Sequence, residues 1–261
     1  MSHISECQEI QVTENLGVLE VAIQRPDRKN ALTHAMYTAI NQAFDYAERE
    51  PTIRALLITG TEGCFTAGND MVDFLQNPPI GDDAPVMILL GKLATFPKPL
   101  IAAVNGPAVG VGTTLLFHCD LVYVGESAKL QMPFTSLGLC PEAGSSYLLP
   151  LMIGHQRAAE LLMLGEVIDG QRACQLGIAN AVLADAETLS HARAQAARIV
   201  AQPAAAVRLT KELMRAPFKD MLHSHMKVEG DAFGKRLVSP EGREAMQAFM
   251  EKRKPNFSQF D

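Results

Sequence analysis

Glu142 stands out in this sequence because its type and its surroundings together suggest proton transfer. It lies in the stretch LGLCPEAGSSYLLP, residues 137–150, among apolar, glycine and hydroxyl residues with no basic residue nearby. Apolar surroundings raise the pKa of a carboxyl group, and a pKa near neutrality suits a base that removes and returns a proton. The alternative is that Glu142 only caps a helix that starts near Ser145.

Two loops of small residues could stabilise the negative charge that proton removal creates on a carbonyl oxygen. In the first, FTAGND at 65–70, Ala67 and Gly68 leave room for a ligand to approach the backbone. The second, GVGTTL at 110–115, follows an apolar strand and opens a helix. We interpret the two loops as the halves of an oxyanion hole made of backbone N–H groups. A dinucleotide-binding loop is excluded because Leu115 stands where the third glycine is required.

Other polar residues near these segments have structural explanations. Asp70 and Asp73 are predicted to cap the short helix that follows the first loop, since acidic residues suit the first turn of a helix. His118 ends an apolar helix and is predicted to be a core histidine with a hydrogen-bond partner. Ser145 and Ser146 lack a G-x-S-x-G frame, so we expect an N-cap role and not a nucleophile.

The composition of the whole chain is that of an ordinary soluble globular protein. Its 261 residues are 48% hydrophobic and 20% charged, and the formal net charge is -6, which argues against nucleic acid as a partner. No targeting segment is visible at the start, so we expect a cytoplasmic protein. The cysteines are widely spaced without a C-x-x-C pair, which predicts neither a disulfide framework nor a metal site.

One uncharged stretch, residues 99–119, is long enough to imitate a membrane span. Its middle contains Asn105, Gly106 and Pro107, which divide it into a buried strand, a turn and a buried helix. We therefore expect no membrane role.

The periodicity of the chain predicts an α/β architecture followed by helices. Apolar and polar residues alternate at 17–24 as in a half-buried strand, and helical spacing follows at 33–50 with Thr33 as N-cap. This rhythm of strands and helices repeats up to residue 186, and we assign 1–186 to an α/β core and 187–261 to a helical C-terminal part. The helices expected in this last part span 187–201, 203–216, 219–236 and 239–252.

Four motifs in this order carry a resemblance to a known family. They are RPDRKNAL (25–32), LLITGTEGCFTAGND (56–70), KPLIAAVNGPAVGVGTTLLFHCDL (98–121) and FTSLGLCPEAGSSYLLP (134–150). Together they resemble the crotonase, or enoyl-CoA hydratase/isomerase, superfamily, and the resemblance covers essentially the whole chain. It implies a spiral of repeated β-β-α units with a helical C-terminal part that forms trimers. It also implies a coenzyme A thioester as substrate and no metal or redox cofactor.

The resemblance assigns roles to individual positions. The oxyanion donors would be the backbone N–H groups of Asn69, which follows Ala67 and Gly68, and of Val111. In relatives, the last helix approaches the coenzyme A site. Candidate contacts to coenzyme A come from the loop after the first strand and from that last helix; they are Arg25, Arg28, Lys29, Ala31, Phe249 and Lys252.

The sequence departs from the family pattern where hydratases carry their two glutamates. Those positions hold Thr114 and Phe134, neither of which transfers protons as a carboxylate does. Glu142 instead occupies the position at which monofunctional Δ3,Δ2-enoyl-CoA isomerases resemble this sequence. A single base can move a double bond, so we expect an isomerase. Two alternatives stay open: a hydratase or other crotonase-type lyase that uses an unexpected acid, and a catalytically silent acyl-CoA-binding module.

The C-terminal helices also suggest assembly. Leu213, Met214, Leu222, Met226 and Phe233 are apolar positions that a small appendage could hardly bury alone. We expect them to pack between subunits, in a homotrimer or a dimer of trimers.

Overall fold

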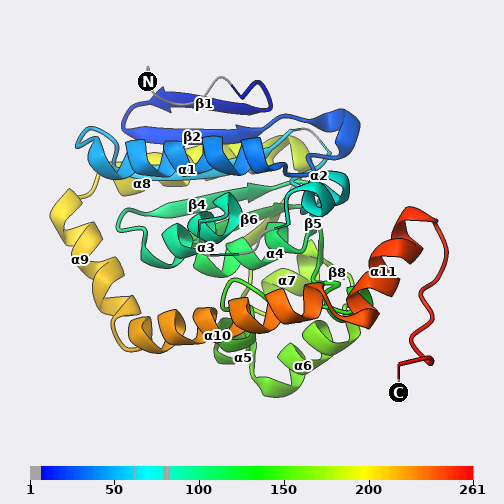
Figure 1. Cartoon of the computed structure of the whole chain (residues 1–261). Helices are drawn as coiled ribbons and strands as arrows, with labels where there is room; N and C mark the ends of the chain where they lie inside the picture. Colours follow the sequence, from blue (N-terminus) through cyan, green and yellow to red (C-terminus); the bar gives the residue numbers. More distant parts are fainter. Residues whose placement is uncertain (1–6, 62, 79–80, 82, 261) are drawn as a thin grey trace.

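The computed structural model describes residues 7–61, 63–78, 81 and 83–260. Its largest sheet has six strands in the order β1-β2-β3-β4-β6-β9 (Figure 1). β1 and β2 pair antiparallel, and each later neighbour in the sheet pairs parallel. The bounds of these strands are Ile10–Asn15 (β1), Val18–Ile23 (β2), Ala55–Gly60 (β3), Leu100–Val104 (β4), Leu121–Gly125 (β6) and Ala181–Leu183 (β9).

A smaller sheet lies beside the first and has the order β5-β7-β8, with Pro107–Val109 (β5), Lys129–Gln131 (β7) and Ile168–Asp169 (β8). Within the described residues, three short 3-10 helices connect elements: Pro26–Arg28 (η1), Leu115–His118 (η2) and Thr135–Leu137 (η3). The first seven α-helices are His34–Arg49 (α1), Met71–Gln76 (α2), Pro85–Thr95 (α3), Val111–Thr114 (α4), Ser145–Ile153 (α5), His155–Leu164 (α6) and Gly170–Gln175 (α7). Four more follow: Asp185–Val200 (α8), Ala204–Arg215 (α9), Lys219–Leu237 (α10) and Pro240–Met250 (α11).

Helices cover both faces of the six-stranded sheet. The expected N-cap of α1 is confirmed, since Thr33 accepts a hydrogen bond from the N–H of Met36 at 3.3 Å. On the opposite face, α8 packs on the central strands through Ala192 and Ala196, both fully buried. Small side chains let the helix approach the sheet closely. α8 therefore belongs to the core layers, although our division at residue 186 assigns most of it to the C-terminal part.

The helices α9 and α10 leave the sheet and run around the lower part of the molecule to α11 (Figure 1). Leu222 is buried in the main core, and Met226 and Phe233 pack against that core from the same chain. Leu222 therefore needs no partner subunit, contrary to our expectation, whereas packing of the partly buried Met226 and Phe233 between subunits stays a prediction. Leu213 and Met214, in contrast, remain 63% and 60% exposed.

The uncharged stretch 99–119 folds as expected, into the strands β4 and β5 and the turn that leads into α4 and η2. No helix within the described ranges is both long and apolar enough to cross a membrane. Our expectation about targeting rests on the first ten residues, of which 1–6 lie outside the described ranges.

Candidate active site

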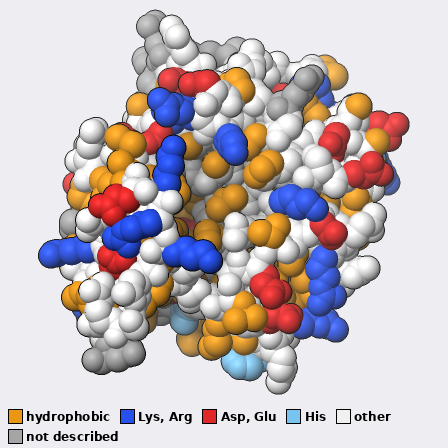
Figure 2. All heavy atoms as spheres, turned by 90° about the vertical axis from the view of Figure 1, so that its right-hand side faces the viewer, with side chains coloured by type: hydrophobic (Ala, Val, Ile, Leu, Met, Phe, Trp, Pro, Cys, Tyr) orange, Lys and Arg blue, Asp and Glu red, His pale blue; other side chains and the backbone are white. Residues whose placement is uncertain are grey.

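A cavity of about 490 Å³ brings together segments that are far apart in the sequence. Its wall contains the loop after β2, both small-residue loops, the turn before α5, and side chains of α10 and α11. The face seen in Figure 2 is hollowed near its centre, with hydrophobic side chains in the hollow and Lys and Arg side chains beside it. The site thus combines an apolar interior with a basic rim.

Glu142 lies in the wall of this cavity. One oxygen of its carboxyl group accepts a hydrogen bond from the hydroxyl of Thr114. Burial raises the pKa of Glu142 to about 7; the Thr114 hydrogen bond opposes this rise and the negative charge of Glu229 adds to it. The expectation of a raised pKa is therefore confirmed, although a second carboxylate contributes to it.

The backbone around Glu142 forms a tight turn with unusual dihedral angles. Ala143 has φ 59° and Gly144 has φ 69°, so a residue with a side chain adopts the left-handed region directly after the glutamate. The ring Nε2 of His118 lies 2.7 Å from the carbonyl oxygen of Ala143. This contact restrains the strained residue, and it confirms that His118 is a core histidine with a partner. Burial lowers the pKa of His118 to about 4, which keeps the ring neutral.

The start of α5 corrects two expectations about capping. Gly144 is its N-cap, and the cap is made by Glu229 of α10, whose carboxylate accepts from the N–H groups of Gly144 (2.5 Å) and Ser146 (2.9 Å). The N-cap roles expected for Ser145 and Ser146 are therefore wrong. The carboxyl group of Glu142 turns to Thr114, so its side chain does not cap α5 either; its carbonyl accepts from Ser145 instead.

The two small-residue loops lie side by side, as an oxyanion hole requires. A bridge pairs Thr66 with Ala108, and the N–H of Val109 donates to the carbonyl of Thr66 at 3.0 Å. Gly68 has φ 86°, and a Cβ atom on it would lie 2.7 Å from the carbonyl oxygen of Val109. This position therefore requires glycine.

Asn69 and Val111 both line the cavity. In the described part of the chain neither N–H has a hydrogen-bond acceptor. Val111 is the first residue of α4 and needs no positive φ, so its side chain is compatible with a donor role. The geometry leaves both donors available to a ligand oxygen.

Of the basic residues predicted to contact coenzyme A from the loop after β2, Arg28 and Lys29 line the cavity and Arg25 does not. Arg28, Lys29 and Ala31 line it, together with Ala67 and Gly68 of the first oxyanion loop. Basic side chains at the rim suit a phosphate-bearing ligand.

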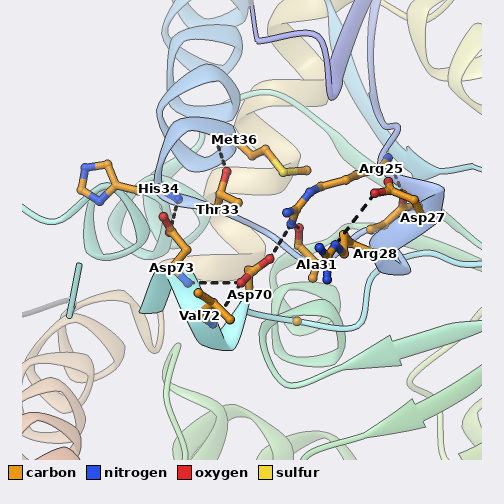
Figure 3. Close-up of polar contacts among 12 residues, drawn as sticks. Arg25, Asp27, Arg28, Ala31, Thr33, His34, Met36, Asp70, Val72 and Asp73 are labelled. Carbon is orange, nitrogen blue, oxygen red and sulfur yellow. Dashed lines mark hydrogen bonds and ion pairs between the residues drawn. The ribbon is translucent and has the colours of Figure 1, made fainter. Parts of the chain in front are cut away.

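Arg25 is not among the residues that line the cavity. Its guanidinium pairs with Asp70 at 2.7 Å and donates to the carbonyl of Ala31 at 2.9 Å (Figure 3). The structure thus gives Arg25 a role in joining the loop after β2 to the start of α2, and does not bring it to the site as a phosphate ligand.

The two acids after the first oxyanion loop act as caps. Asp70 accepts from the N–H groups of Val72 (3.0 Å) and Asp73 (3.2 Å) at the start of α2, as expected. Asp73 caps the neighbouring helix instead, because it accepts from the N–H of His34 at 2.7 Å (Figure 3). Both carboxylates fix the loop that carries Asn69.

The C-terminal helix reaches the cavity with one of its two predicted contacts. Phe249 is part of the wall, whereas Lys252 is not among the residues that form it. Phe134, which stands where hydratases have a glutamate, lines the cavity as an apolar residue. No cluster of His, Cys, Asp or Glu suited to a metal occurs in the described ranges.

Sequence reasoning missed two residues that support the site. Glu229 lies 87 positions after Glu142, in a helix whose pattern gave no hint of a contact with the turn. The hydroxyl of Tyr37 donates to the side-chain oxygen of Asn69 at 2.6 Å. Tyr37 sits on the buried face of α1, where a tyrosine within an apolar pattern signals a hydroxyl that needs a partner but not which one.

Comparisons with known proteins show the family of the chain. The family model described as enoyl-CoA hydratase/isomerase matches residues 13–260. The 1,2-epoxyphenylacetyl-CoA isomerase of Escherichia coli (strain K12) is 35% identical over 93% of this chain and 95% of its own length. Enoyl-CoA delta isomerase 2 of Homo sapiens is 32% identical over 93% of this chain, which spans 63% of that protein.

Hydratases match at similar identity. Crotonyl-CoA hydratase of Syntrophomonas wolfei is 34% identical over 94% of this chain and 95% of its own length. Among solved structures, that of Pseudomonas aeruginosa OdaA has a TM-score of 0.91 and 52% identity, with 94% of this chain and 99% of that one covered. The spiral fold implied by the sequence motifs is thereby confirmed.

Proposed function

Because the chain belongs to the enoyl-CoA hydratase/isomerase family, whose members process acyl-CoA thioesters, we propose that it isomerises 3-enoyl-CoA to 2-enoyl-CoA. The observation that carries this proposal is that no cation pairs with Glu142 in the described part of the chain. Of the two carboxylates in the cavity wall, Asp70 is paired with Arg25, whereas Glu142 has no cationic partner in the described part of the chain.

The geometry supports a mechanism with one base. Glu142 removes a proton from C2 of the substrate, and the electrons of that C–H bond delocalise over C2, C3, C4 and the thioester carbonyl as a dienolate. The N–H groups of Asn69 and Val111 stabilise the negative charge on the carbonyl oxygen. The protonated Glu142 then returns its proton to C4, which leaves the double bond between C2 and C3. A pKa of about 7 lets one group perform both transfers near neutral pH.

Water addition needs a second acid, and the other carboxylate of the cavity wall, Asp70, is held by Arg25. Thr114 and Phe134 stand where hydratases have their two glutamates, and the hydroxyl of Thr114 is already bound to Glu142. The similarity to a crotonyl-CoA hydratase keeps hydration as the second candidate.

The rest of the cavity fits the remainder of a coenzyme A thioester. Arg28 and Lys29 at the rim would face its phosphates, and Phe249 would cover the ligand from α11. The apolar interior would hold the acyl group.

The decisive experiment compares the wild type with Glu142→Gln on 3-enoyl-CoA and 2-enoyl-CoA esters. Gln keeps the volume of Glu but cannot accept the C2 proton, so kcat for isomerisation should fall by at least about 100-fold while thioester binding changes little. Near wild-type isomerisation by the variant would contradict the proposal. Faster hydration than isomerisation by the wild type would favour the hydratase, and binding without any turnover would favour a silent module.

We also propose that the chain assembles as a homotrimer or a dimer of trimers. Leu213 and Met214 are largely exposed on α9. Met214 lines a second hollow, of about 890 Å³, between α5, α9 and α10. Burying such apolar surface between subunits would stabilise an oligomer. Sedimentation at micromolar concentration should show a trimer or hexamer, and a stable monomer would contradict the proposal.

A further inference from the structure

Glu229 is a buried carboxylate outside the cavity wall, with only 6% of its surface exposed. It belongs to α10 and accepts three hydrogen bonds from the residues that follow Glu142 in the sequence. The donors are the N–H groups of Gly144 (2.5 Å) and Ser146 (2.9 Å) and the hydroxyl of Ser146 (2.5 Å). No Lys or Arg pairs with it within the described ranges. A buried acid without a Lys or Arg partner needs an explanation beyond an ordinary ion pair.

We propose that Glu229 is a positioning residue for Glu142: it fixes the turn that carries the base and places a negative charge near it. This inference rests on the proposed role of Glu142. Glu229 does not touch the substrate cavity and acts only through the turn and through its charge.

The geometric part of the proposal concerns the turn. Ala143 and Gly144 both have positive φ, a conformation that costs free energy for Ala and persists only when neighbouring groups hold it. His118 contacts the carbonyl of Ala143 from one side, and Glu229 accepts from the N–H of Gly144 on the other. The carboxylate also satisfies the first N–H groups of α5, where a negative charge is favourable. Losing it should let Glu142 shift relative to the oxyanion donors.

The electrostatic part concerns the groups that face Glu229 from each side. Cys140 and Glu142 lie in the loop before α5; burial raises the pKa of both, and the negative charge of Glu229 adds to the rise. From its own helix, the ring Nε2 of His225 lies 3.8 Å from a carboxylate oxygen of Glu229. The same ring nitrogen also contacts the hydroxyl of Ser146. Arg236, further along α10, lies near Cys140 and binds the carbonyl of Gly138. The negative charge of Glu229 therefore acts on Glu142 without a salt bridge to Lys or Arg that would neutralise it.

The test is Glu229→Gln, which keeps the shape but removes the charge and one of the two acceptor oxygens. We expect kcat for isomerisation to fall about tenfold with little change in KM, because a displaced base affects the chemical step. Since Glu142 must be deprotonated to act, the acid limb of the pH profile should move to lower pH, by roughly half a unit. Glu229→Asp, which keeps the charge, should retain the wild-type limb.

The matched control is Asp231→Asn, which removes an exposed carboxylate from the same helix and should change neither kcat nor the acid limb. A second readout does not depend on turnover: carbon-13 NMR of the Glu142 carboxyl, assigned by its loss in Glu142→Gln, should show a lower pKa in Glu229→Gln. If that pKa falls in Glu229→Gln but the wild type does not isomerise 3-enoyl-CoA esters, the proposed function fails and this inference stands. If Glu229→Gln only lowers Tm and leaves kcat, the acid limb and the NMR titration unchanged, the positioning role is wrong.

Discussion

The two halves of the site are built in different ways. The oxyanion half uses backbone N–H groups on loops joined by main-chain hydrogen bonds, with Gly68 allowing the close approach. The half that holds the base uses side chains from three elements: Thr114 of α4, His118 of η2 and Glu229 of α10. Small side chains let a ligand approach the donors of the first half, whereas in the second half the chemical group itself is a side chain held by side chains from distant parts of the chain.

The difference predicts how each half responds to substitution. In the oxyanion half only changes that displace or remove an N–H should matter. In the base half, polar substitutions away from the cavity should alter the pKa of Glu142 and therefore the pH profile.

The largest effect in the oxyanion half is expected for Val111→Pro, which removes one proposed donor. Proline is tolerated at the first position of a helix, so the chain should still fold. Loss of one oxyanion donor lowers turnover by about 100-fold or more. Steady-state kinetics on 3-enoyl-CoA, with KM compared, measures this. Val111→Ala is the matched control and should stay within a few-fold of the wild type; if both variants are equally active, the N–H of Val111 is not a donor.

Much of the first half could be predicted from the sequence, because glycine and alanine at fixed spacing indicate where a ligand can approach the backbone N–H groups. The second half could be predicted only in part. The apolar neighbours of Glu142 indicated its raised pKa, but nothing in the pattern of α10 links Glu229 to a turn 87 residues earlier. The same limitation led us to assign Leu222 to a subunit interface, when its partner is the core of its own chain.

A second prediction concerns stability, because the pKa of Glu142 rises from its ordinary 4.5 to about 7 on folding. A carboxyl with a raised pKa favours the folded state below pH 4.5, and this contribution is lost as the pH rises through 7. Glu142→Gln carries no charge to bury. Relative to the wild type, the variant should therefore gain stability between pH 4.5 and pH 8, by about 1–2 kcal/mol after allowance for water in the cavity.

Thermal or urea unfolding of both proteins at the two pH values measures this gain. His118 is present in both, so its own titration cancels in the comparison. An equal difference in stability at pH 4.5 and pH 8 would show that the pKa of Glu142 is not raised by folding.

A third prediction tests the hydrogen bond from Thr114 to Glu142. This bond favours the ionised carboxylate and so lowers its pKa. Thr114→Val keeps the shape and removes the donor, so the acid limb of the pH profile should move to higher pH by up to about one unit, with kcat above the limb changed only a few-fold. The shift is opposite in sign to that expected for Glu229→Gln. A limb that moves to lower pH in Thr114→Val would contradict the assignment of Glu142 as the titrating base.

The smallest effect on turnover is expected for Asn69→Ala, since the proposed donor is the main-chain N–H of Asn69. The substitution leaves the N–H in place, so kcat should stay within about fivefold of the wild type. Its cost should appear in stability instead, because the buried hydroxyl of Tyr37 loses its 2.6 Å partner and an unsatisfied buried donor costs about 1–3 kcal/mol. The double variant with Tyr37→Phe removes both partners and should recover much of that loss, which a double-mutant cycle measures. If Asn69→Ala loses turnover by 100-fold while thioester binding is intact, the amide side chain takes part in the chemistry, and the contrast between a backbone half and a side-chain half no longer holds.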